Sequence, residues 1–435
     1  MKPVFLVDAI RTPFAKAGSD LKNVHAAELG RFAVSELLAR TGVPLKDIGN
    51  LVDEVIIGNA GTPADSANIA RVVALLAGLP QHLSAYTVHR NCASGMESVA
   101  QAALKVSAGV GDLYIAGGTE SMSQAPLIYN NKAVAFFERL QRARSLQDRL
   151  KVLASTPVAE FLKPRISIME GLTDPTCGLN MGDTAEILAK EFKISREKQD
   201  EFALRSHQRA VDAESKGLMS EEIAPYAVPP EYTKILTSDV GPRKGQSLEA
   251  LAKLKPFFDK KFGTVTAGNA CPITDGAAMA LIASDTGLEK LGRPKPLARI
   301  KAWAFAGLDP RRMGLGPVFA THRVLKETGL SLKDFGVIEI NEAFAAQVMA
   351  CLLAFDSDAF CKEYLGRSSK MGEIDVGLLN PNGGAIAMGH PVGATGTRII
   401  LTAAKEMRRR KAKYGLATLC IGGGQGGAVI LESIE

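Results

Sequence analysis

The amino-acid sequence contains no apolar run that approaches the roughly 18–20 residues needed to cross a bilayer as a helix. The apolar stretch within residues 1–11 is only as long as a strand and is interrupted by Asp8, so it is not a secretory signal. Composition gives no sign of disorder, because 46% of the 435 residues are hydrophobic and 23% are charged. These features predict a cytoplasmic protein with a large core, divided into two or three domains.

Cysteine is scarce, and none of the six cysteines forms a CxxC pair. A disulfide framework or a structural zinc site is therefore not expected, and no other metal-ligand cluster stands out. The charge is also nearly balanced, with 52 basic and 46 acidic residues giving a net charge of +6. This mild excess does not indicate a nucleic-acid-binding protein, but it is compatible with an anionic ligand such as a nucleotide phosphate.

Strand-like and helical stretches alternate along the N-terminal part of the chain. Apolar residues recur at helical spacing in residues 26–40, for example. The expected order is strand 3–9, helix 26–40, strand 52–58, helix 68–76, strand 84–88, helix 96–106 and strand 113–117. Such βαβαβ order predicts an α/β fold with a mostly parallel sheet covered by helices.

The C-terminal third repeats this plan. Its expected strands are 296–306, 336–340, 415–420 and 427–432, and its expected helices include 317–328, one ending at Leu353, and 397–410. In both parts a glycine-containing turn opens a helix, and a later strand ends in a glycine cluster, which favours an internal duplication over two coincidentally similar domains. The predicted halves are residues 1–122, completed by about 270–295, and residues 296–435. Residues 123–269 form a loop segment that covers a site.

Two residues in these turns are candidates for nucleophilic chemistry. Cys92 lies among small residues at the expected start of a helix, where backbone N–H groups and the helix dipole lower the pKa of a thiol and favour the thiolate. The alternative is a buried structural cysteine, which is the commoner fate. His390 lies between Gly389 and Pro391 at a strand's carboxyl end, where open α/β sheets bind ligands, and this position favours a base.

Two further candidates follow predicted strands. Cys420 precedes a glycine-rich turn, residues 422–424, whose backbone N–H groups can approach a ligand. A dinucleotide-binding loop is disfavoured because this turn leads into a strand and not into a helix. Asn341 could donate to an oxyanion or cap a helix. Together the four residues have one sensible use. One thiol is a nucleophile and the other moves a proton, while the imidazole and the amide help to activate the nucleophile and to stabilise negative oxygen.

Four sequence blocks resemble the signature motifs of the thiolase family: Asn91-Cys92-Ala93-Ser94-Gly95, Asn341-Glu342-Ala343-Phe344, Gly389-His390-Pro391-Val392-Gly393-Ala394-Thr395-Gly396 and Cys420-Ile421-Gly422-Gly423-Gly424. The resemblance covers essentially the whole sequence. It implies duplicated βαβαβ halves layered α-β-α-β-α, with an inserted loop domain. It also implies that Cys92 is acylated, that His390 activates it, and that Cys420 is the acid/base. It further implies two oxyanion holes. Asn341, through a water, and His390 would stabilise the enolate, and the N–H groups of Cys92 and Gly422 would stabilise the tetrahedral intermediate.

By the same resemblance, a set of mostly apolar residues contacts coenzyme A (CoA) and the acyl group: Leu172, Met181, Phe258, Ala267, Gly268, Cys271, Met313, Ala343 and Phe344. The sequence departs from many relatives at two places, with Asn180 in place of histidine and Cys271 in place of serine. CoA is expected as a co-substrate, and no permanently bound cofactor or metal is expected.

Residues 125–170 resemble the insertion of the β-subunits of fatty-acid-oxidation multienzyme complexes. Apolar residues at helical spacing, from Phe136 to Leu153, alternate there with arginines, as in a basic amphipathic helix. The resemblance implies contact with a hydratase/dehydrogenase partner subunit or a membrane surface; a lid over the active site is the alternative. Those β-subunits generally have histidine at the position of Asn341.

The resemblance thus implies an acyl-CoA:acetyl-CoA C-acyltransferase that cleaves 3-ketoacyl-CoA to acetyl-CoA and a shortened acyl-CoA in fatty-acid β-oxidation, or runs as a Claisen condensation. It also implies a homodimer or homotetramer. The alternatives are a ketoacyl synthase, which generally uses two histidines, and a non-catalytic lipid-carrier or scaffold subunit, which would be expected to lack Cys92 or His390.

Overall fold

The fold is built on one large mixed sheet. The computed structural model describes residues 2–155, 161 and 164–434. The strands follow one another in the order β12-β13-β14-β11-β1-β10-β5-β3-β4, and β2 pairs with β10. Their bounds are β1 Phe5–Arg11, β2 Ala15–Lys16, β3 Glu54–Gly58, β4 Ser84–Val88, β5 Leu113–Ser121, β10 Thr274–Ala283, β11 Ala298–Gly307, β12 Phe335–Ile340, β13 Tyr414–Ile421 and β14 Gln425–Glu432.

The prediction of a mostly parallel sheet is wrong. Only the pairs β3–β4, β3–β5 and β12–β13 are parallel among the described strands of this sheet, and the other pairs are antiparallel. β13 and β14 are joined by the short turn at residues 422–424, and so short a connection permits only antiparallel pairing. β10 enters the sheet from the long loop segment and runs against both β1 and β5.

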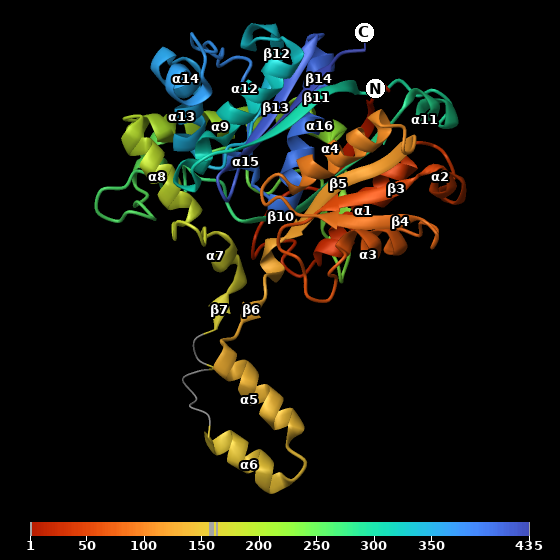
Figure 1. Cartoon of the computed structure of the whole chain (residues 1–435), viewed down its shortest axis with the longest axis vertical. Helices are drawn as coiled ribbons and strands as arrows, with labels where there is room; N and C mark the ends of the chain where they lie inside the picture. The colour runs from red at the N-terminus through yellow and green to blue at the C-terminus, as the bar shows by residue number, and fades with distance from the viewer. Residues whose placement is uncertain (1, 156–160, 162–163, 435) are drawn as a thin grey trace.

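Helices cover both outer faces and fill the middle of the molecule (Figure 1). α1 (Ala26–Ala39) and α3 (Ile69–Leu76) pack on the N-terminal strands, and α12 (Gly316–Thr328) packs on β11, β13 and β14. Between the two half-sheets lie α4 (Ser94–Ser107) and α16 (Val392–Arg410), and α16 contacts strands of both. The half-sheets join where β1 and β11 pair at only two positions. The predicted α-β-α-β-α layering is confirmed.

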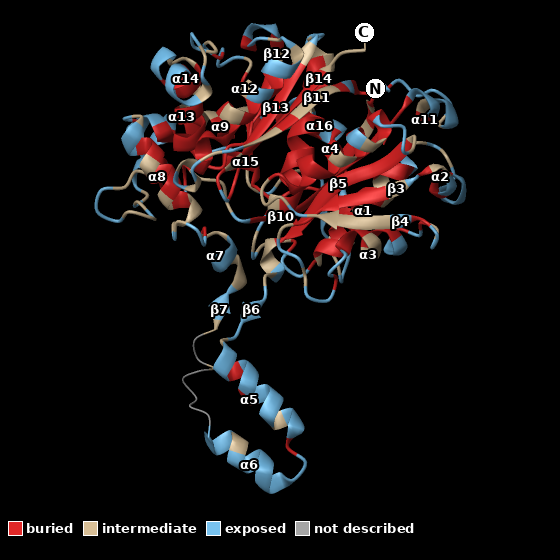
Figure 2. Cartoon of the chain, in the orientation of Figure 1, coloured by how far each residue is buried: buried red, intermediate tan, exposed pale blue. Residues whose placement is uncertain are grey.

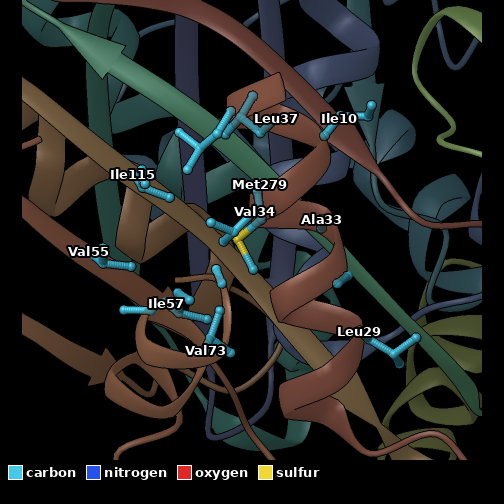
Figure 3. Packing of buried hydrophobic residues seen from close by; sticks show 14 of the residues in the cluster. Ile10, Leu29, Ala33, Val34, Leu37, Val55, Ile57, Val73, Ile115 and Met279 are labelled. Carbon is cyan, nitrogen blue, oxygen red and sulfur yellow. The ribbon is translucent and has the colours of Figure 1, made fainter. Parts of the chain in front are cut away.

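The strands alternate their side chains between separate cores. Val55 and Ile57 of β3 face the core beneath α1 and α3, whereas Ile56 between them faces the central core around α4 and α16. Figure 3 shows the first of these cores, where Val55, Ile57 and Ile115 meet Val34 and Leu37. Where both faces are buried, as in β5 and β10, the strand consists mostly of apolar and small residues.

Residues 122–273 contribute no described strand to the large sheet. They form the small pairs β6 (Leu127–Ile128) with β7 (Arg165–Ile166) and β8 (Tyr226–Ala227) with β9 (Ile235–Leu236). Their helices are α5 Asn131–Arg142, α6 Leu146–Ser155, α7 Ser167–Gly171, α8 Met181–Glu191, α9 Arg196–Ser215 and α10 Leu248–Ala252. The remaining helices of the protein are α2 Leu45–Leu51, α11 Asp285–Lys290, α13 Ala345–Phe355, α14 Asp358–Leu365 and α15 Ala385–Met388.

The insertion is two helices and not the single amphipathic helix that the sequence pattern predicts. α5 ends at an extended Ala143, and Ser145 caps α6 by accepting a hydrogen bond from Asp148 N at 3.1 Å. The α5–α6 pair projects away from the body of the protein (Figure 1), and most of its surface is exposed (Figure 2). No helix in the described residues is both long and apolar enough to span a membrane.

Candidate active site

Cys92 lies in the turn between β4 and α4, which ends against the β13–β14 turn. Asn91 adopts the left-handed conformation, with φ of 44°, and its Nδ2 donates to Gly422 O at 2.8 Å. This bond ties the cysteine turn of one half to the glycine turn of the other. The backbone N–H groups of Gly422 and of Cys92 itself act on the sulfur by lowering the pKa of the thiol. They are the two donors predicted for the tetrahedral intermediate.

The ionisation predicted for Cys92 is wrong in direction. Burial raises the pKa of its thiol above the ordinary 9.0, and this effect outweighs the lowering by the two N–H groups. The Glu120 carboxylate raises that pKa further. The helix-dipole argument neglects desolvation, since Cys92 is partly buried and its thiol is partly withdrawn from water. Cys92 is therefore a neutral thiol in this structure and requires a base.

His390 provides a base of defined orientation. Its Nδ1 lies 2.6 Å from Thr395 Oγ1, and Thr395 Oγ1 donates to Pro391 O at 2.9 Å. Because a hydroxyl has one proton, Thr395 accepts from Nδ1–H, and Nε2 carries the lone pair. Nε2 is buried and has no hydrogen-bond partner among the residues that the structure describes. Burial lowers the pKa of His390 to about 3, so the imidazole is neutral.

Asn341 follows β12, at the same sheet edge as Cys420. Both its amide nitrogen and its amide oxygen are buried without a partner among the described residues. The alternative prediction, that Asn341 caps a helix, is wrong, because α13 begins after Phe344 and not after Asn341. A buried amide that makes no hydrogen bond costs about 1–3 kcal/mol. Such a group is suited to a ligand that provides the missing partners.

Cys420 lies near the end of β13 and is 1% exposed. Burial raises the pKa of its thiol well above 9.0, and the neighbouring thiols of Cys92, Cys351 and Cys271 raise it further. Cys420 is thus protonated and within electrostatic range of Cys92. A neutral thiol in this place can give a proton to carbon or sulfur and later take one back.

Short backbone contacts bring the remaining loops to the same place. Cys271 N donates to Ala343 O at 3.0 Å, which joins its loop to the loop after Asn341. Two residues further on, Ile273 forms a β-bridge with His390. The sheet edge therefore assembles the predicted catalytic groups from loops that are far apart in the sequence.

The predicted CoA contacts divide into two groups. Six of them pack in one apolar cluster with Cys420: Met181, Phe258, Cys271, Met313, Ala343 and Phe344. Leu172 is linked to this cluster by its backbone, because its carbonyl oxygen accepts a hydrogen bond from Met181 N at 2.9 Å. Ala267 is exposed on a turn, and Gly268 packs closely against Leu251 and Leu254.

Motif reasoning missed three polar residues that shape this site. Asn91 holds Gly422, Thr395 orients His390, and the buried Glu120 accepts a hydrogen bond from Gly393 N at 2.9 Å. Asn91 and Thr395 belong to the recognised motifs, and Glu120 follows the glycine pair of β5. Their types and positions were visible in the sequence, but their partners were not.

The structure has the groups that a thiol-dependent acyl transfer needs: a cysteine whose turn is bonded to Gly422, a neutral imidazole, a second thiol and an amide without a partner among the described residues. The comparisons with known proteins agree. The sequence matches the thiolase N-terminal domain over residues 4–286 and the thiolase C-terminal domain over residues 294–433. It is 41% identical over 430 residues to the 3-ketoacyl-CoA thiolase of Yersinia pestis (strain Pestoides F), covering 99% of this chain and 96% of that protein.

Two solved structures are similar over their whole length. The acetyl-CoA acetyltransferase of Bacillus anthracis is 36% identical with a TM-score of 0.84, covering 100% of this chain and 99% of the other. Human mitochondrial 3-ketoacyl-CoA thiolase in complex with CoA is 38% identical with a TM-score of 0.85, covering 99% and 98%. The protein belongs to the thiolase family.

Proposed function

We propose that this protein cleaves 3-ketoacyl-CoA with CoA, through an acyl-enzyme on Cys92, and that the reaction also runs in reverse as a Claisen condensation. The observation that carries the proposal is that the Gly422 turn of one half is bonded to the Cys92 turn of the other: Asn91 Nδ2 donates to Gly422 O at 2.8 Å, and the Gly422 N–H lowers the pKa of the Cys92 thiol. When the sulfur attacks a carbonyl carbon, the N–H groups of Gly422 and Cys92 can donate to the oxygen that becomes negative. The names of the relatives support thiolase chemistry.

The first half of the reaction forms the acyl-enzyme. His390 Nε2 takes the proton of Cys92, and the thiolate attacks the 3-keto carbon. The tetrahedral oxyanion accepts from the N–H groups of Cys92 and Gly422. When the C2–C3 bond breaks, its electron pair goes to the thioester enolate, which Asn341, through a water, and His390 stabilise. Cys420 then protonates C2 and acetyl-CoA leaves.

The second half returns the acyl group to CoA. The Cys420 thiolate, left after protonation of C2, takes the proton of incoming CoA. The CoA sulfur attacks the acyl-Cys92 thioester, and the same pair of N–H groups stabilises the oxyanion. Cys92 leaves as the thiolate and takes back from His390 the proton that it gave in the first half. The apolar cluster of Met181, Phe258 and Met313 beside Cys420 would contact pantetheine and acyl carbons. CoA is a co-substrate here, and the solved human relative in complex with CoA supports this part of the proposal.

The decisive experiment measures CoA-dependent cleavage of acetoacetyl-CoA and of a 3-ketoacyl-CoA with a long acyl group, by the wild type and by Cys92→Ser. Both substrates test the activity, and their ratio separates an acetyl-CoA C-acetyltransferase from an acyltransferase that prefers longer substrates. Cys92→Ser should stay folded and lose turnover, because a serine hydroxyl is far less ionised than a thiol. Mass spectrometry should find the acyl group on the peptide that contains Cys92.

Each alternative has its own outcome in this experiment. Acylation of Cys420 and not of Cys92 would reverse the two cysteine roles. Condensation that requires malonyl-thioester, with no CoA-dependent cleavage, would indicate a ketoacyl synthase. A wild type that binds acyl-CoA without turnover would be a carrier or scaffold.

We further propose that the protein forms a homodimer or homotetramer through the edge strand β4. Among the strands that the structure describes, β4 pairs only with β3, and its side chains are exposed or half-buried. Leu75 and Leu76 of α3 and Leu104 of α4 are exposed on the two helices that pack on β4. An open strand edge with apolar flanks favours pairing with another polypeptide. Leu76→Glu with Leu104→Glu should shift the mass in solution toward the monomer.

The insertion is proposed to contact a hydratase/dehydrogenase partner subunit or a membrane surface. Leu146, Leu150 and Leu153 are 74%, 56% and 53% exposed on one side of α6. A lid would have to pack on the active-site mouth, whereas the α5–α6 pair projects away from the body (Figure 1).

A cytoplasmic location is also proposed, and it is supported by the six cysteines, all of which are free thiols.

A further inference from the structure

Glu120, near the end of β5, is a carboxylate buried between the two halves of the protein. It is 3% exposed, and its four hydrogen-bond donors are all uncharged. Oε1 accepts from Asn59 Nδ2 at 3.0 Å and Gly61 N at 2.9 Å. Oε2 accepts from Ala60 N and from Gly393 N, both at 2.9 Å. One carboxylate therefore joins the loop after β3 to the start of α16.

The bond to Gly393 replaces the cap that α16 lacks. α16 begins after Pro391, whose side chain makes no hydrogen bond to the helix. The first N–H groups of a helix have no partner within the helix, and a negative charge there is favourable. Glu120 accepts that N–H from a strand of the other half. Burial raises the pKa of its carboxyl to about 7, so the group is fully charged only above that pH. The helix turn that it holds follows His390 directly and includes Thr395, the hydrogen-bond partner of the imidazole.

The close approach at this point depends on glycines. A Cβ at Gly118 would lie 1.9 Å from Gly393 O, and a Cβ at Gly95 would lie 2.7 Å from the same oxygen. The start of α16 thus rests on the strand that carries Glu120 and on the helix that follows Cys92. The carboxylate bond and the glycine contacts fix the position of the histidine turn relative to the cysteine turn.

We propose that Glu120 is a positioning residue of the thiolase reaction, which acts by capping α16 from the opposite half and so holding His390 in place toward Cys92. The inference rests on the proposed function. Glu120 also acts on the nucleophile electrostatically, since its charge raises the pKa of the Cys92 thiol. The thiols of Cys271 and Cys420 also interact electrostatically with Cys92, and His390 is the base proposed to face it.

The test compares Glu120→Gln with Glu406→Gln. Glu406 is a buried carboxylate near the other end of α16, bonded to Asn382, Arg409 and Arg410, so its replacement removes a comparable network far from His390. Glutamine at position 120 turns an NH₂ group toward N–H donors. The expected result is a fall in kcat of at least ~10-fold with KM within ~2-fold, because misplacement of a catalytic group slows chemistry more than binding. Glu406→Gln should keep the wild-type kcat.

The second readout is the pH dependence of Cys92 alkylation by iodoacetamide, followed by mass spectrometry. Loss of the Glu120 charge should move the midpoint to lower pH, whereas Glu406→Gln should leave it in place. An unchanged kcat, or a lower kcat with an unchanged midpoint, would overturn the proposal. If Glu120→Gln does not fold, the variant Asn59→Ala is measured in its place. A wild-type kcat for Asn59→Ala would also overturn the proposal. A wild type without thiolysis would refute the proposed function itself.

Discussion

The two cysteines of the site have different surroundings although both are neutral thiols. The backbone N–H groups of Gly422 and Cys92 lower the pKa of the Cys92 thiol, and they can stabilise negative charge on its sulfur or on an oxygen bound beside it. Cys420 is 1% exposed in an apolar cluster and has other thiols as its main electrostatic neighbours. A sulfur of the first kind suits covalent chemistry, and one of the second kind suits the transfer of a proton.

Cys420→Ala should separate these roles. The variant should still acylate Cys92 from an acyl-CoA, because the N–H donors and His390 remain. It should lose the exchange of deuterium at C2 of acetyl-CoA, since the group that moves that proton is gone. The measurement is NMR of acetyl-CoA in D₂O, with mass spectrometry of the Cys92 peptide. Exchange at the wild-type rate would assign the proton transfer to another group.

Thr395→Val tests whether the orientation of His390 depends on one hydroxyl. Valine has nearly the shape of threonine but cannot accept from Nδ1–H, so the lone pair is no longer fixed on Nε2. We expect kcat for thiolysis to fall roughly 10–100-fold, the range found when the partner of a catalytic or ligating histidine is lost. Thr402→Val is the matched control, because Thr402 is buried in the same helix and bonds to Glu222 and not to His390. Equal activity of the two variants would contradict the assignment.

At the scale of single residues, the sequence predicted which side chains lie together in the site but not the direction of their pKa shifts. Cys92, His390, Cys420 and Asn341 were identified from motifs, and the structure places them on one sheet edge. The pKa of Cys92 was predicted in the wrong direction because burial cannot be read from a local turn. Glu120 was missed because its partners are at residues 59–61 and 393, which only the fold brings together.

Among the elements, the crossing of α4 and α16 is the one that sets the site. Both helices begin at a catalytic turn, and they meet through Gly95, Gly393 and Thr397, whose Oγ1 donates to Gly95 O at 3.0 Å. Helices can approach this closely only where no Cβ intervenes. The distance between the Cys92 and His390 turns therefore depends on small residues at the crossing.

Gly95→Ala should push the two helices apart. The added Cβ would lie 2.7 Å from both Gly393 O and Thr397 Oγ1. Overpacking of this kind costs about 1–3 kcal/mol of unfolding free energy, and kcat should fall because the base moves away from the thiol. Urea unfolding and thiolysis measure the two effects. Gly245→Ala is the control, because nothing lies within 4 Å of its Cβ position. Wild-type stability of Gly95→Ala would show that the crossing can relax.

Element positions were predicted better than their pairing. The helix predicted at residues 26–40 is observed at Ala26–Ala39, and the strand predicted at 84–88 is β4. β10 was not predicted as an element of its own, because its alanine-rich run is buried on both faces and has no alternation to read. The start of α16 was placed five residues too late at Thr397, since Pro391 and Gly393 have the composition of a loop.

At the scale of the whole molecule, a buried histidine should make the fold sensitive to acid. His207 of α9 is 5% exposed, and burial, aided by Arg243, lowers its pKa from 6.5 to about 4. In the unfolded polypeptide His207 binds a proton below about pH 6.5, whereas in the folded protein it stays neutral down to about pH 4. The contribution of neutral His207 to the free energy of unfolding is therefore fully present above pH 6.5 and is lost as the pH falls toward 4. At pH 5 this amounts to about 2 kcal/mol.

His207→Gln, which keeps an acceptor for Arg243 N, should reduce the loss of stability between pH 7.5 and pH 5 by about that amount. Urea unfolding at the two pH values provides the measurement. His82→Gln, at an exposed position, should lose as much stability as the wild type. An unchanged pH dependence of His207→Gln would mean that His207 is protonated in the folded protein.

The insertion is the part of the molecule that the rest of the fold explains least. Phe136 is 7% exposed, and its ring packs against Phe137 of α5 and against Phe161, which follows α6 in the sequence, so the insertion has a small core of its own. The leucines of α6 lie outside that core. Arginines surround them, at positions 139, 142, 144 and 149, and Arg142, Arg144 and Arg149 are exposed. Exposed apolar residues among cations suit an anionic or amphipathic partner surface.

Replacing Arg139, Arg142 and Arg144 with glutamate should weaken that association and leave thiolysis intact, because the α5–α6 pair lies away from Cys92 (Figure 1). Flotation with vesicles of anionic phospholipid tests the membrane surface, and co-purification with a hydratase/dehydrogenase subunit tests the protein partner. Lys326→Glu, Lys333→Glu and Lys362→Glu change the charge equally at exposed positions on the body and should alter neither measurement. Wild-type association together with crippled thiolysis would show that the insertion acts on the active site as a lid. Loss of vesicle binding alone would identify the membrane as the surface that α6 contacts.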